Sequence, residues 1–434
     1  DVSIGSAGEG PGRLFLQQRS GRFVESTQGQ PWARDKSHDD WGAVFIDANG
    51  DGLPDLYVAS CGYELAPASR RLQDRLYINR GGGRFVRDSS ALPAMLTCTA
   101  SVSAGDFNQD GRPDLFVGGR LTPRRYPYPT RSYLLRNDGG HFTDVTSEVA
   151  PALAQPFGMV TSAVWVDFDG DGRVDLVTTG EWMGPTFFRN AGGRFEDVTA
   201  ATGLGPMRGW WFSLAAGDFN EDGRPDLVAG NLGLNFMYAT SPANRFGVYA
   251  GDFSSSQATD VVLTQEREGV EYPFFGRAKV GSAILPTALR FGTYEAFAKA
   301  SVPQLFGSEA LKRALHYRAD TFASVYLQNL GGGKFTAVAL PRVAQIAPMR
   351  GILTTDVDRD GHLDLIVAGN LTATEPNTPP ADAGNGLWLR GDGRGGFSAV
   401  APVESGFLAP RNVAGLALVK TPPGNGVLGA NNAQ

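Results

Sequence analysis

Five short segments of the chain crowd oxygen-bearing side chains into nine residues each. Every segment follows the pattern Asp-x-Asp/Asn-x-Asp-Gly-x-x-Asp, which sets such side chains at positions 1, 3, 5 and 9. Calcium is a hard cation that takes about six to eight oxygen ligands from carboxylates, amides, backbone carbonyls and water. Position 7 can add its backbone carbonyl, and the glycine at position 6 permits a sharp turn. The spacing therefore predicts a calcium site in each segment.

The predicted ligands occupy the same five positions of each loop, and the predicted structural calcium sites number about five. The ligands are Asp47, Asn49, Asp51, Leu53 and Asp55; Asp106, Asn108, Asp110, Arg112 and Asp114; Asp167, Asp169, Asp171, Arg173 and Asp175; Asp218, Asn220, Asp222, Arg224 and Asp226; and Asp356, Asp358, Asp360, His362 and Asp364.

Two other interpretations of these loops have to be weighed. An EF-hand begins with the same pattern but needs a Glu at position 12 and a helix on either side. Position 12 here is Val, Thr or Ala, as at Val58 and Thr178, and the flanks read as strands. Asp-rich turns also form without metal, but nearly identical loops at one place in a repeat favour calcium. A sixth segment, residues 252–260, lacks the central acid and the glycine, which argues against a metal there.

The acidic loops alternate with glycine-rich turns, and the two together form a repeat. Each acidic loop lies between two apolar runs, such as residues 42–46 and 55–58. Glycine turns, as at residues 81–83 and 192–193, lie between runs rich in β-branched and aromatic residues, which is a hairpin signal. One acidic hairpin and one glycine hairpin make four antiparallel strands, the size of one propeller blade.

The two ends of the chain predict how these blades close into a ring. The chain opens on a glycine hairpin, residues 14–23, that no acidic hairpin precedes. It ends on two strands, near residues 412–419 and 426–430, that no glycine hairpin follows. Pairing of the N- and C-terminal strands in one blade would remove both open edges. We therefore predict an all-β fold, a seven-bladed β-propeller that forms a single domain over residues 1–434.

The count of seven includes two assignments that the structure can test. Residues 252–260 are taken as the acidic loop of a blade of their own. Residues 236–249 are assigned as the outer strands of the blade that begins near Phe212. One mostly irregular or helical insertion, residues 266–321, is expected to interrupt a blade.

Composition limits the environment and the partners of the protein. The formal net charge is -6 over 434 residues, and no cluster of Lys and Arg suggests nucleic acid. No window approaches 18 consecutive apolar residues, so the sequence predicts no membrane-spanning helix. The two cysteines, Cys61 and Cys98, fall in neighbouring predicted loops, which favours a disulfide over two separate thiols and an oxidising compartment. The first residue is Asp1, which fits a mature protein without its leader or a fragment of a longer one.

The calcium loops resemble those of the FG-GAP/VCBS repeat family, whose best-known member domain is the integrin α-subunit propeller. Residues 209–218, 230–235 and 293–297 are further similar to bacterial secreted proteins of the ASPIC/UnbV group. The resemblance implies calcium at the positions named above and an extracellular or periplasmic location. It implies no shared enzymatic activity. The acids missing at residues 256–257 and in the terminal blade depart from the family pattern, which implies metal-free blades there.

The function prediction rests on the face that should carry the longer loops. Calcium loops and glycine turns share one predicted face, whereas long irregular loops, where binding usually resides, share the other. We predict a non-enzymatic protein-interaction or assembly module whose protein partner binds the long-loop face. The insertion either packs on the rim or docks that partner. A glycan-binding module and a polysaccharide lyase or other sugar-processing enzyme are the alternatives, although the scattered histidines give no zinc spacing.

Overall fold

Antiparallel β-sheets make up most of the structure. The computed structural model describes residues 2–5, 10–26, 29–421 and 424–431. Within them the strands form eight antiparallel sheets, and the helices are short. The all-β prediction is therefore confirmed.

Five of the sheets follow the predicted plan of an acidic hairpin and a glycine hairpin. The second strand of each is buried along its whole length, because it lies inside the sheet and packs on both faces. The first four sheets along the chain are β4 (Asp40–Ile46), β5 (Asp55–Ser60), β6 (Arg75–Asn79) and β7 (Phe85–Asp88); β8 (Thr99–Gly105), β9 (Asp114–Gly119), β10 (Tyr133–Asn137) and β11 (Phe142–Asp144); β12 (Met159–Val166), β13 (Asp175–Met183), β14 (Thr186–Asn190) and β15 (Phe195–Asp197), with β16 (Gly209–Trp210) added; and β17 (Ser213–Gly217), β18 (Asp226–Gly230), β23 (Val325–Gly331) and β24 (Lys334–Ala339). The fifth contains β25 (Gly351–Thr355), β26 (Asp364–Ala368), β27 (Leu387–Gly391) and β28 (Phe397–Val400).

The sheet that begins near Phe212 takes its outer strands from a distant part of the chain. Strand β18 pairs with β23, where Leu227 lies opposite Leu327. The assignment of residues 236–249 to this sheet was therefore wrong. The outer strands of this sheet are joined by the glycine turn at 331–333, which has the hairpin sequence that the sheet requires.

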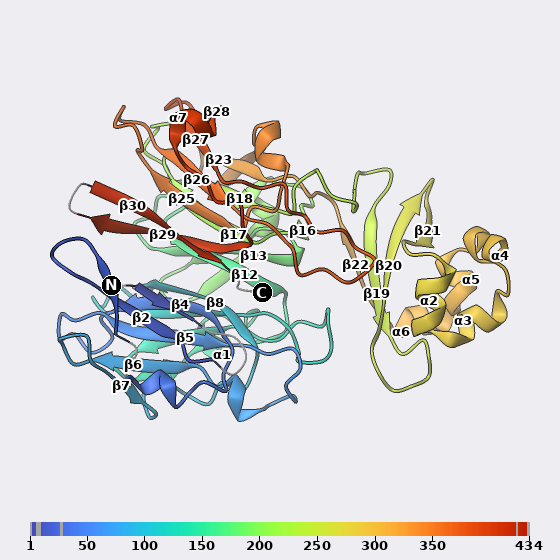
Figure 1. The fold of residues 1–434 in the computed structure, drawn as a ribbon, viewed down its shortest axis with the longest axis horizontal. Helices are drawn as coiled ribbons and strands as arrows, with labels where there is room; N and C mark the ends of the chain where they lie inside the picture. The colour runs from blue at the N-terminus through green and yellow to red at the C-terminus, as the bar shows by residue number, and fades with distance from the viewer. Residues whose placement is uncertain (1, 6–9, 27–28, 422–423, 432–434) are drawn as a thin grey trace.

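The segment between β18 and β23 forms a sheet of its own beside the others. Its strands are β19 (Phe246–Gly251), β20 (Asp260–Arg267), β21 (Val270–Pro273) and β22 (Leu315–Ala319), in the order β21-β20-β19-β22. Figure 1 shows this sheet at the right of the molecule, with the helices beyond it. The helices are α2 (Arg277–Ala283), α3 (Leu285–Arg290), α4 (Tyr294–Lys299), α5 (Val302–Phe306) and α6 (Ser308–Arg313). They enclose a small core that includes Val262, Ile284 and Phe297.

Successive sheets are joined by one recurring side-chain bond. Asn137 donates to the carbonyl of Ala48 in the preceding sheet at 3.0 Å, and Asn190 donates to Phe107 in the same way at 2.8 Å. Asn329 in β23 continues the series to Phe168 at 2.9 Å. The first strands β4, β8, β12, β17, β25 and β29 (Val413–Thr421) also pack each on the next.

The acidic-type loop at residues 252–260 lies outside this succession. The fourth sheet contacts the fifth directly, because Gly395 donates its backbone N–H to Phe219 at 3.0 Å and β17 packs on β25. The sequence predicted that this segment forms a blade between the fourth and fifth sheets. In the structure those two sheets are direct neighbours. The sequence of the loop was recognised correctly, but its two strands pair within the inserted sheet.

The strands at the two ends of the chain form separate small sheets within the described residues. One contains β1 (Val2–Ile4), β2 (Arg13–Gln17) and β3 (Phe23–Glu25), and the other contains β29 and β30 (Gly424–Asn431). The two approach each other where Gln17 donates to the carbonyl of Lys420. The remaining helical turns are η1 (Pro31–Ala33), η2 (Arg70–Leu72), α1 (Thr146–Val149), η3 (Thr199–Thr202), η4 (Arg342–Gln345) and α7 (Pro402–Ser405).

A disulfide joins the first two four-stranded sheets. Cys61 directly follows β5, Cys98 directly precedes β8, and their Cα atoms are 4.2 Å apart. Both side chains are buried, with at most 1% exposed. The predicted disulfide is confirmed.

We expect Asn190→Ala to destabilise the protein more than Asn79→Ala. The buried Asn190 side chain holds both its own sheet, through the Val174 carbonyl, and the preceding one. Asn79 has the same place in its repeat but bonds only within its own sheet among the described residues. The groups that lose their bonds to the side chain should lower the free energy of unfolding by about 2–4 kcal/mol in Asn190→Ala and by about half that in Asn79→Ala. Chemical denaturation of both variants measures the difference, and equal losses would contradict the proposed bond between sheets.

A second prediction concerns acid stability of the inserted sheet. Burial raises the pKa of Glu271, but hydrogen bonds from His316, Arg318 and Tyr249 outweigh it and lower the pKa to about 2. A carboxyl whose pKa is lowered on folding stabilises the fold above its ordinary pKa of 4.5. That contribution, roughly 3 kcal/mol at most, should disappear as the pH falls from about 4.5 to about 2.

The variant Glu271→Gln should therefore lose less stability than the wild type over this pH interval. Glu309→Gln is the matched control, because Glu309 is exposed and pairs only with Lys312 among the described residues. Amide hydrogen exchange of β19–β22 as a function of pH measures the effect, and parallel curves for wild type and Glu271→Gln would refute it.

Candidate functional site

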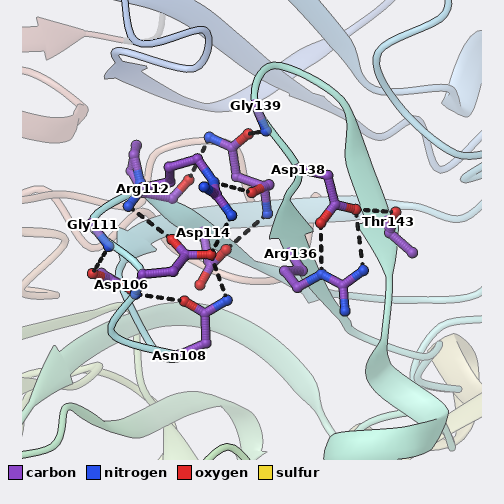
Figure 2. Close-up of polar contacts among 12 residues, drawn as sticks. Asp106, Asn108, Gly111, Arg112, Asp114, Arg136, Asp138, Gly139 and Thr143 are labelled. Atoms are coloured by element: carbon purple, nitrogen blue, oxygen red, sulfur yellow. Dashed lines mark hydrogen bonds and ion pairs between the residues drawn. The ribbon is translucent and has the colours of Figure 1, made fainter.

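Each acidic loop connects the first and second strands of a sheet and folds back on its first residue. In the loop at residues 106–114, Asp106 accepts the backbone N–H groups of Asp110 at 3.0 Å and Gly111 at 2.8 Å (Figure 2). Asn108 also accepts the Asp110 N–H, at 3.1 Å. Gly111 has φ of 83°, a left-handed conformation that favours glycine. The same bonds from positions 5 and 6 to position 1 recur in the other four loops.

The aspartate at position 9 is fully buried and joins three strands. Asp175, for example, accepts the N–H of Phe168 at 3.1 Å and the N–H of Asn190 at 2.7 Å, one on each carboxylate oxygen. Burial raises the pKa of Asp175 to about 7 and that of Asp114 to about 6, and neighbouring acids add to the effect. Burial likewise raises the pKa at the other three loops. A bound cation would favour the ionised form of these groups.

The arginine at position 7 has a role that its assignment as a backbone ligand did not include. Arg112 donates through Nε to the carbonyl of Asn137 at 2.8 Å, and Arg173 donates to that of Asn190 at 2.9 Å. The side chain thereby ties the acidic loop to the glycine hairpin of the same sheet. The recurrence of Arg at this position in three of the five loops was the sequence signal that pointed to such a bond.

Figure 2 shows the glycine hairpin next to the second acidic loop. Arg136 donates to Asp138 at 2.8 Å, and the Thr143 hydroxyl donates to the same carboxylate at 2.6 Å. The Asp138 carboxylate therefore accepts bonds within the glycine hairpin, and it lies outside the acidic loop that contains the predicted ligands. Its bonds fix the turn beside that loop.

Two of the five loops bring three carboxylates together closely enough to hold a metal ion. Oxygen atoms of Asp167, Asp169 and Asp175 lie within 4.8 Å of one another, as do those of Asp356, Asp358 and Asp364. These six residues are positions 1, 3 and 9 of their loops. The other three loops have Asn at position 3, whose amide oxygen can serve as a calcium ligand in place of a carboxylate.

In three of the loops the acid at position 5 pairs with the arginine at position 7. Asp171 pairs with Arg173, Asp222 pairs with Arg224, and Asp110 pairs with Arg112 at 2.6 Å. Each of these acids also accepts the N–H of position 7 through its second oxygen. The donor set at each loop is made of hard oxygens, as calcium requires, and the three-carboxylate clusters fit such an ion.

The degenerate loop at residues 252–260 keeps the same backbone without the same ligands. Asp252 accepts the N–H groups of Ser256 at 2.9 Å and Gln257 at 3.0 Å, as position 1 does elsewhere. Asp260 accepts the N–H of Phe253 at 2.8 Å. The turn thus forms with serines at positions 3 and 5. The backbone conformation of the loop therefore does not depend on acidic ligands at those positions.

The histidines and the tryptophans singled out by the sequence are distributed over the molecule. His362 pairs with Glu221 of the neighbouring acidic loop, and His316 contacts Glu271. Trp182 and Trp211 are buried, and they fill the interior between sheets. No helix in the described part of the chain is long and apolar enough to cross a membrane.

Two solved structures match most of the chain at low similarity. The Vibrio cholerae biofilm matrix protein Bap1 is 10% identical, with 96% of this chain and 81% of that chain covered and a TM-score of 0.34. The exotype rhamnogalacturonan lyase YesX is 11% identical, with 97% and 74% covered and a TM-score of 0.35. A search of curated proteins finds no match.

The model of the FG-GAP-like repeat matches four stretches of the chain, residues 1–58, 65–117, 127–178 and 167–229. The first ends in β5, and the others end within β9, β13 and β18, the second strands of the next three sheets. Each match thus includes an acidic loop with its flanking strands. The chain belongs to the FG-GAP-like repeat family.

Proposed function

We propose that this protein is a secreted, calcium-stabilised β-propeller that acts as a non-enzymatic protein-interaction or assembly module. The observation that carries the proposal is the inserted sheet with its helices, which projects from the repeated sheets (Figure 1) and exposes apolar side chains. Sheets of a propeller need no such appendage for their own packing.

The proposed ring contains the five four-stranded sheets and a sixth blade made of the terminal strands. Its support is the succession of first-strand contacts from β4 to β29, together with the bond between Gln17 and Lys420. The chain then forms one domain over residues 1–434, and the predicted insertion at 266–321 extends to include β19 and β20. We propose six blades in place of the predicted seven, because the segment at 252–260 lies outside the succession.

Calcium is proposed to bind at the five acidic loops and to have a structural role. Positions 1, 3, 5 and 9 would supply side-chain oxygens and position 7 its backbone carbonyl. The ion would offset the repulsion among the loop acids and the burial of Asp175 and its equivalents. Each ion would thereby hold the first two strands of a sheet to the third.

The proposed docking element is the apolar surface of α3 and α4. Leu285 and Leu289, four residues apart on α3, are 60% and 76% exposed, and Tyr294 on α4 is 67% exposed. Large apolar side chains grouped on a projecting unit are typical of protein-binding surfaces. The partner on this surface would bury Leu285 and Leu289 together.

An extracellular or periplasmic location is proposed on the basis of the disulfide between Cys61 and Cys98. Disulfides persist in oxidising compartments and are rare in the reducing cytosol. The buried position of this disulfide fits a structural role rather than a redox-active one.

Removal of calcium should lower the melting temperature, and Asp171→Ser should remove one site. The substitution gives the third loop the residue found at position 5 of the loop at 252–260, where the turn is intact. The measured stoichiometry should therefore fall by one calcium ion per chain while the fold persists. Asp138→Asn is the control, since it removes an acid outside the predicted ligands.

Calorimetric calcium titration and thermal melts with and without chelator measure these effects. A melting temperature that excess chelator leaves unchanged would refute structural calcium. An unchanged stoichiometry in Asp171→Ser would refute a site in that loop.

Loss of the two exposed leucines should abolish partner binding. The protein would be isolated from its natural source in calcium buffer, cross-linked, and its companions identified by mass spectrometry. We expect a stoichiometric protein partner with the wild type and less than about a tenth of it with Leu285→Ser/Leu289→Ser. The matched control is Val403→Ser/Leu408→Ser, which removes side chains that are 92% and 65% exposed elsewhere. Equal retention by both double variants, or no companion at all, would overturn the proposal.

A further inference from the structure

The residue at position 4 of each acidic loop has a left-handed backbone conformation. In the first and third loops this residue is a glycine, Gly50 with φ of 76° and Gly170 with φ of 80°. In the second, fourth and fifth loops it is Gln109, Glu221 and Arg359, with φ of 59°, 58° and 65°. Such a conformation is uncommon for residues that have a side chain. Three loops thus keep a long side chain at a position where glycine would fit with less strain.

Two of these side chains reach the acidic loop of the next sheet. Gln109 donates through Nε2 to the carbonyl of Gly172 at 3.0 Å. Glu221 pairs with His362. The acceptor Gly172 is position 6 of the third loop, and His362 is position 7 of the fifth. The guanidinium of Arg359 lies instead beside the start of β30, in the terminal hairpin, whose sequence has no acidic loop.

The bond from Gln109 holds a peptide group that directly precedes a predicted ligand. This peptide group joins the carbonyl of Gly172 to the N–H of Arg173, and that N–H donates to Asp171 at 3.0 Å. The N–H of Gly172 donates to Asp167 at 2.8 Å. Both acids are predicted calcium ligands, as is the carbonyl of Arg173. Gln109 therefore helps to fix the turn that presents the ligands of the third loop.

The backbone of Gln109 is in turn fixed by the ligands of its own loop. Gln109 lies between Asn108 and Asp110, and the Asp110 N–H donates to Asp106 at 3.0 Å and to Asn108 at 3.1 Å. An ion bound to these three side chains would keep the backbone of Gln109 in its left-handed conformation. The Gln109 side chain would then lose less conformational freedom when it bonds to Gly172. Ordering of the second loop thus favours the bond to the third.

The third and fourth loops lack this connection and are separated by a hollow. Its volume is about 230 Å³, and its lining includes Asp167, Asp169 and Gly170 on one side and Gly223 and Arg224 on the other. Gly170 has no side chain to cross the hollow, and a Cβ added there would meet nothing within 4 Å. The second loop is therefore joined to the third, and the fourth to the fifth. The third and fifth loops are also the two that contain the clusters of three carboxylates.

We propose that Gln109 and Glu221 are positioning residues that couple calcium binding within two pairs of loops, an inference that rests on the calcium sites proposed above. An ion in one loop of a pair orders the bridging side chain, and the bridge orders the other loop. Each ion then raises the affinity for the other by the same factor. One hydrogen bond at an exposed position corresponds to a factor of about two to five. The third and fourth loops bind calcium independently of each other.

Calcium titration of the full chain would be followed at single loops by amide hydrogen exchange and mass spectrometry of residues 167–175 and 218–226. Asp110→Ser should empty the second loop, since the turn at 252–260 is intact with serine at position 5. The calcium concentration that gives half-maximal protection of 167–175 should then rise about threefold. In the Gln109→Gly background Asp110→Ser should change that concentration by less than about 1.5-fold, because the bridge is already lost.

The next pair of loops provides the matched control. Asp171→Ser empties the third loop in the same way, but it should leave the calcium titration of 218–226 within about 1.5-fold of the wild type, because Gly170 makes no bridge. Gly170→Gln should place a side chain in the hollow, within reach of the Gly223 carbonyl. In that background Asp171→Ser should weaken calcium binding at 218–226 about threefold. A newly created coupling cannot come from misfolding.

The outcomes separate this inference from the proposed calcium sites. If calcium protects neither segment of the wild type, the calcium sites themselves are refuted. If calcium protects both segments but Asp110→Ser leaves 167–175 unchanged, or acts equally with and without Gln109→Gly, only the coupling is overturned. Absence of coupling in Gly170→Gln would overturn the role assigned to position 4.

Discussion

The buried aspartate at the end of each acidic loop is the constraint on which the repeat depends. One carboxylate oxygen accepts an N–H at the start of the loop and the other accepts an N–H from the third strand, as Asp226 does with Phe219 and Asn329. The Asn329 side chain in turn donates to the preceding sheet. Loop, sheet and neighbouring sheet are thus joined through one residue. Burial of a carboxyl group is unfavourable for its ionised form, so the surrounding N–H groups, and a cation where one binds, are what make it tolerable.

Local patterns in the sequence predicted the hairpins of the fold because the residues of each hairpin are contiguous in the chain. The loop at 167–175, its flanking strands and the glycine turn before Phe195 all follow from spacing and residue type. The same patterns could not show that the partner of β18 begins at Val325, because hairpin signals carry no information about a sheet that a long insertion divides. They also could not bring Arg120 and Glu181 together, since that depends on how sheets are placed around one another.

The two ends of the repeated sheets have different physical characters. At one end, short loops of nearly one sequence concentrate negative charge around hard oxygen ligands. At the other, connections of different length place the largely buried ion pair of Arg120 and Glu181 beside the half-exposed Trp41. The inserted sheet belongs to this second end, since Trp182 and Phe246 stack across the boundary. Binding properties can therefore vary at one end while the loops at the other preserve the framework.

The nesting of one sheet within another bears on how the chain reaches its native state. Strands β18 and β23 are separated by almost a hundred residues, and closing a flexible loop of that length carries an entropic cost. The inserted unit begins with β19 and ends with β22, and these strands are neighbours, with Phe246 opposite Ala319. Once the insertion has folded around its own core, its two ends lie close together, and the divided sheet closes across a short gap instead of a long one. Early folding of the insertion would thus serve as a local clamp that speeds assembly of the fourth sheet.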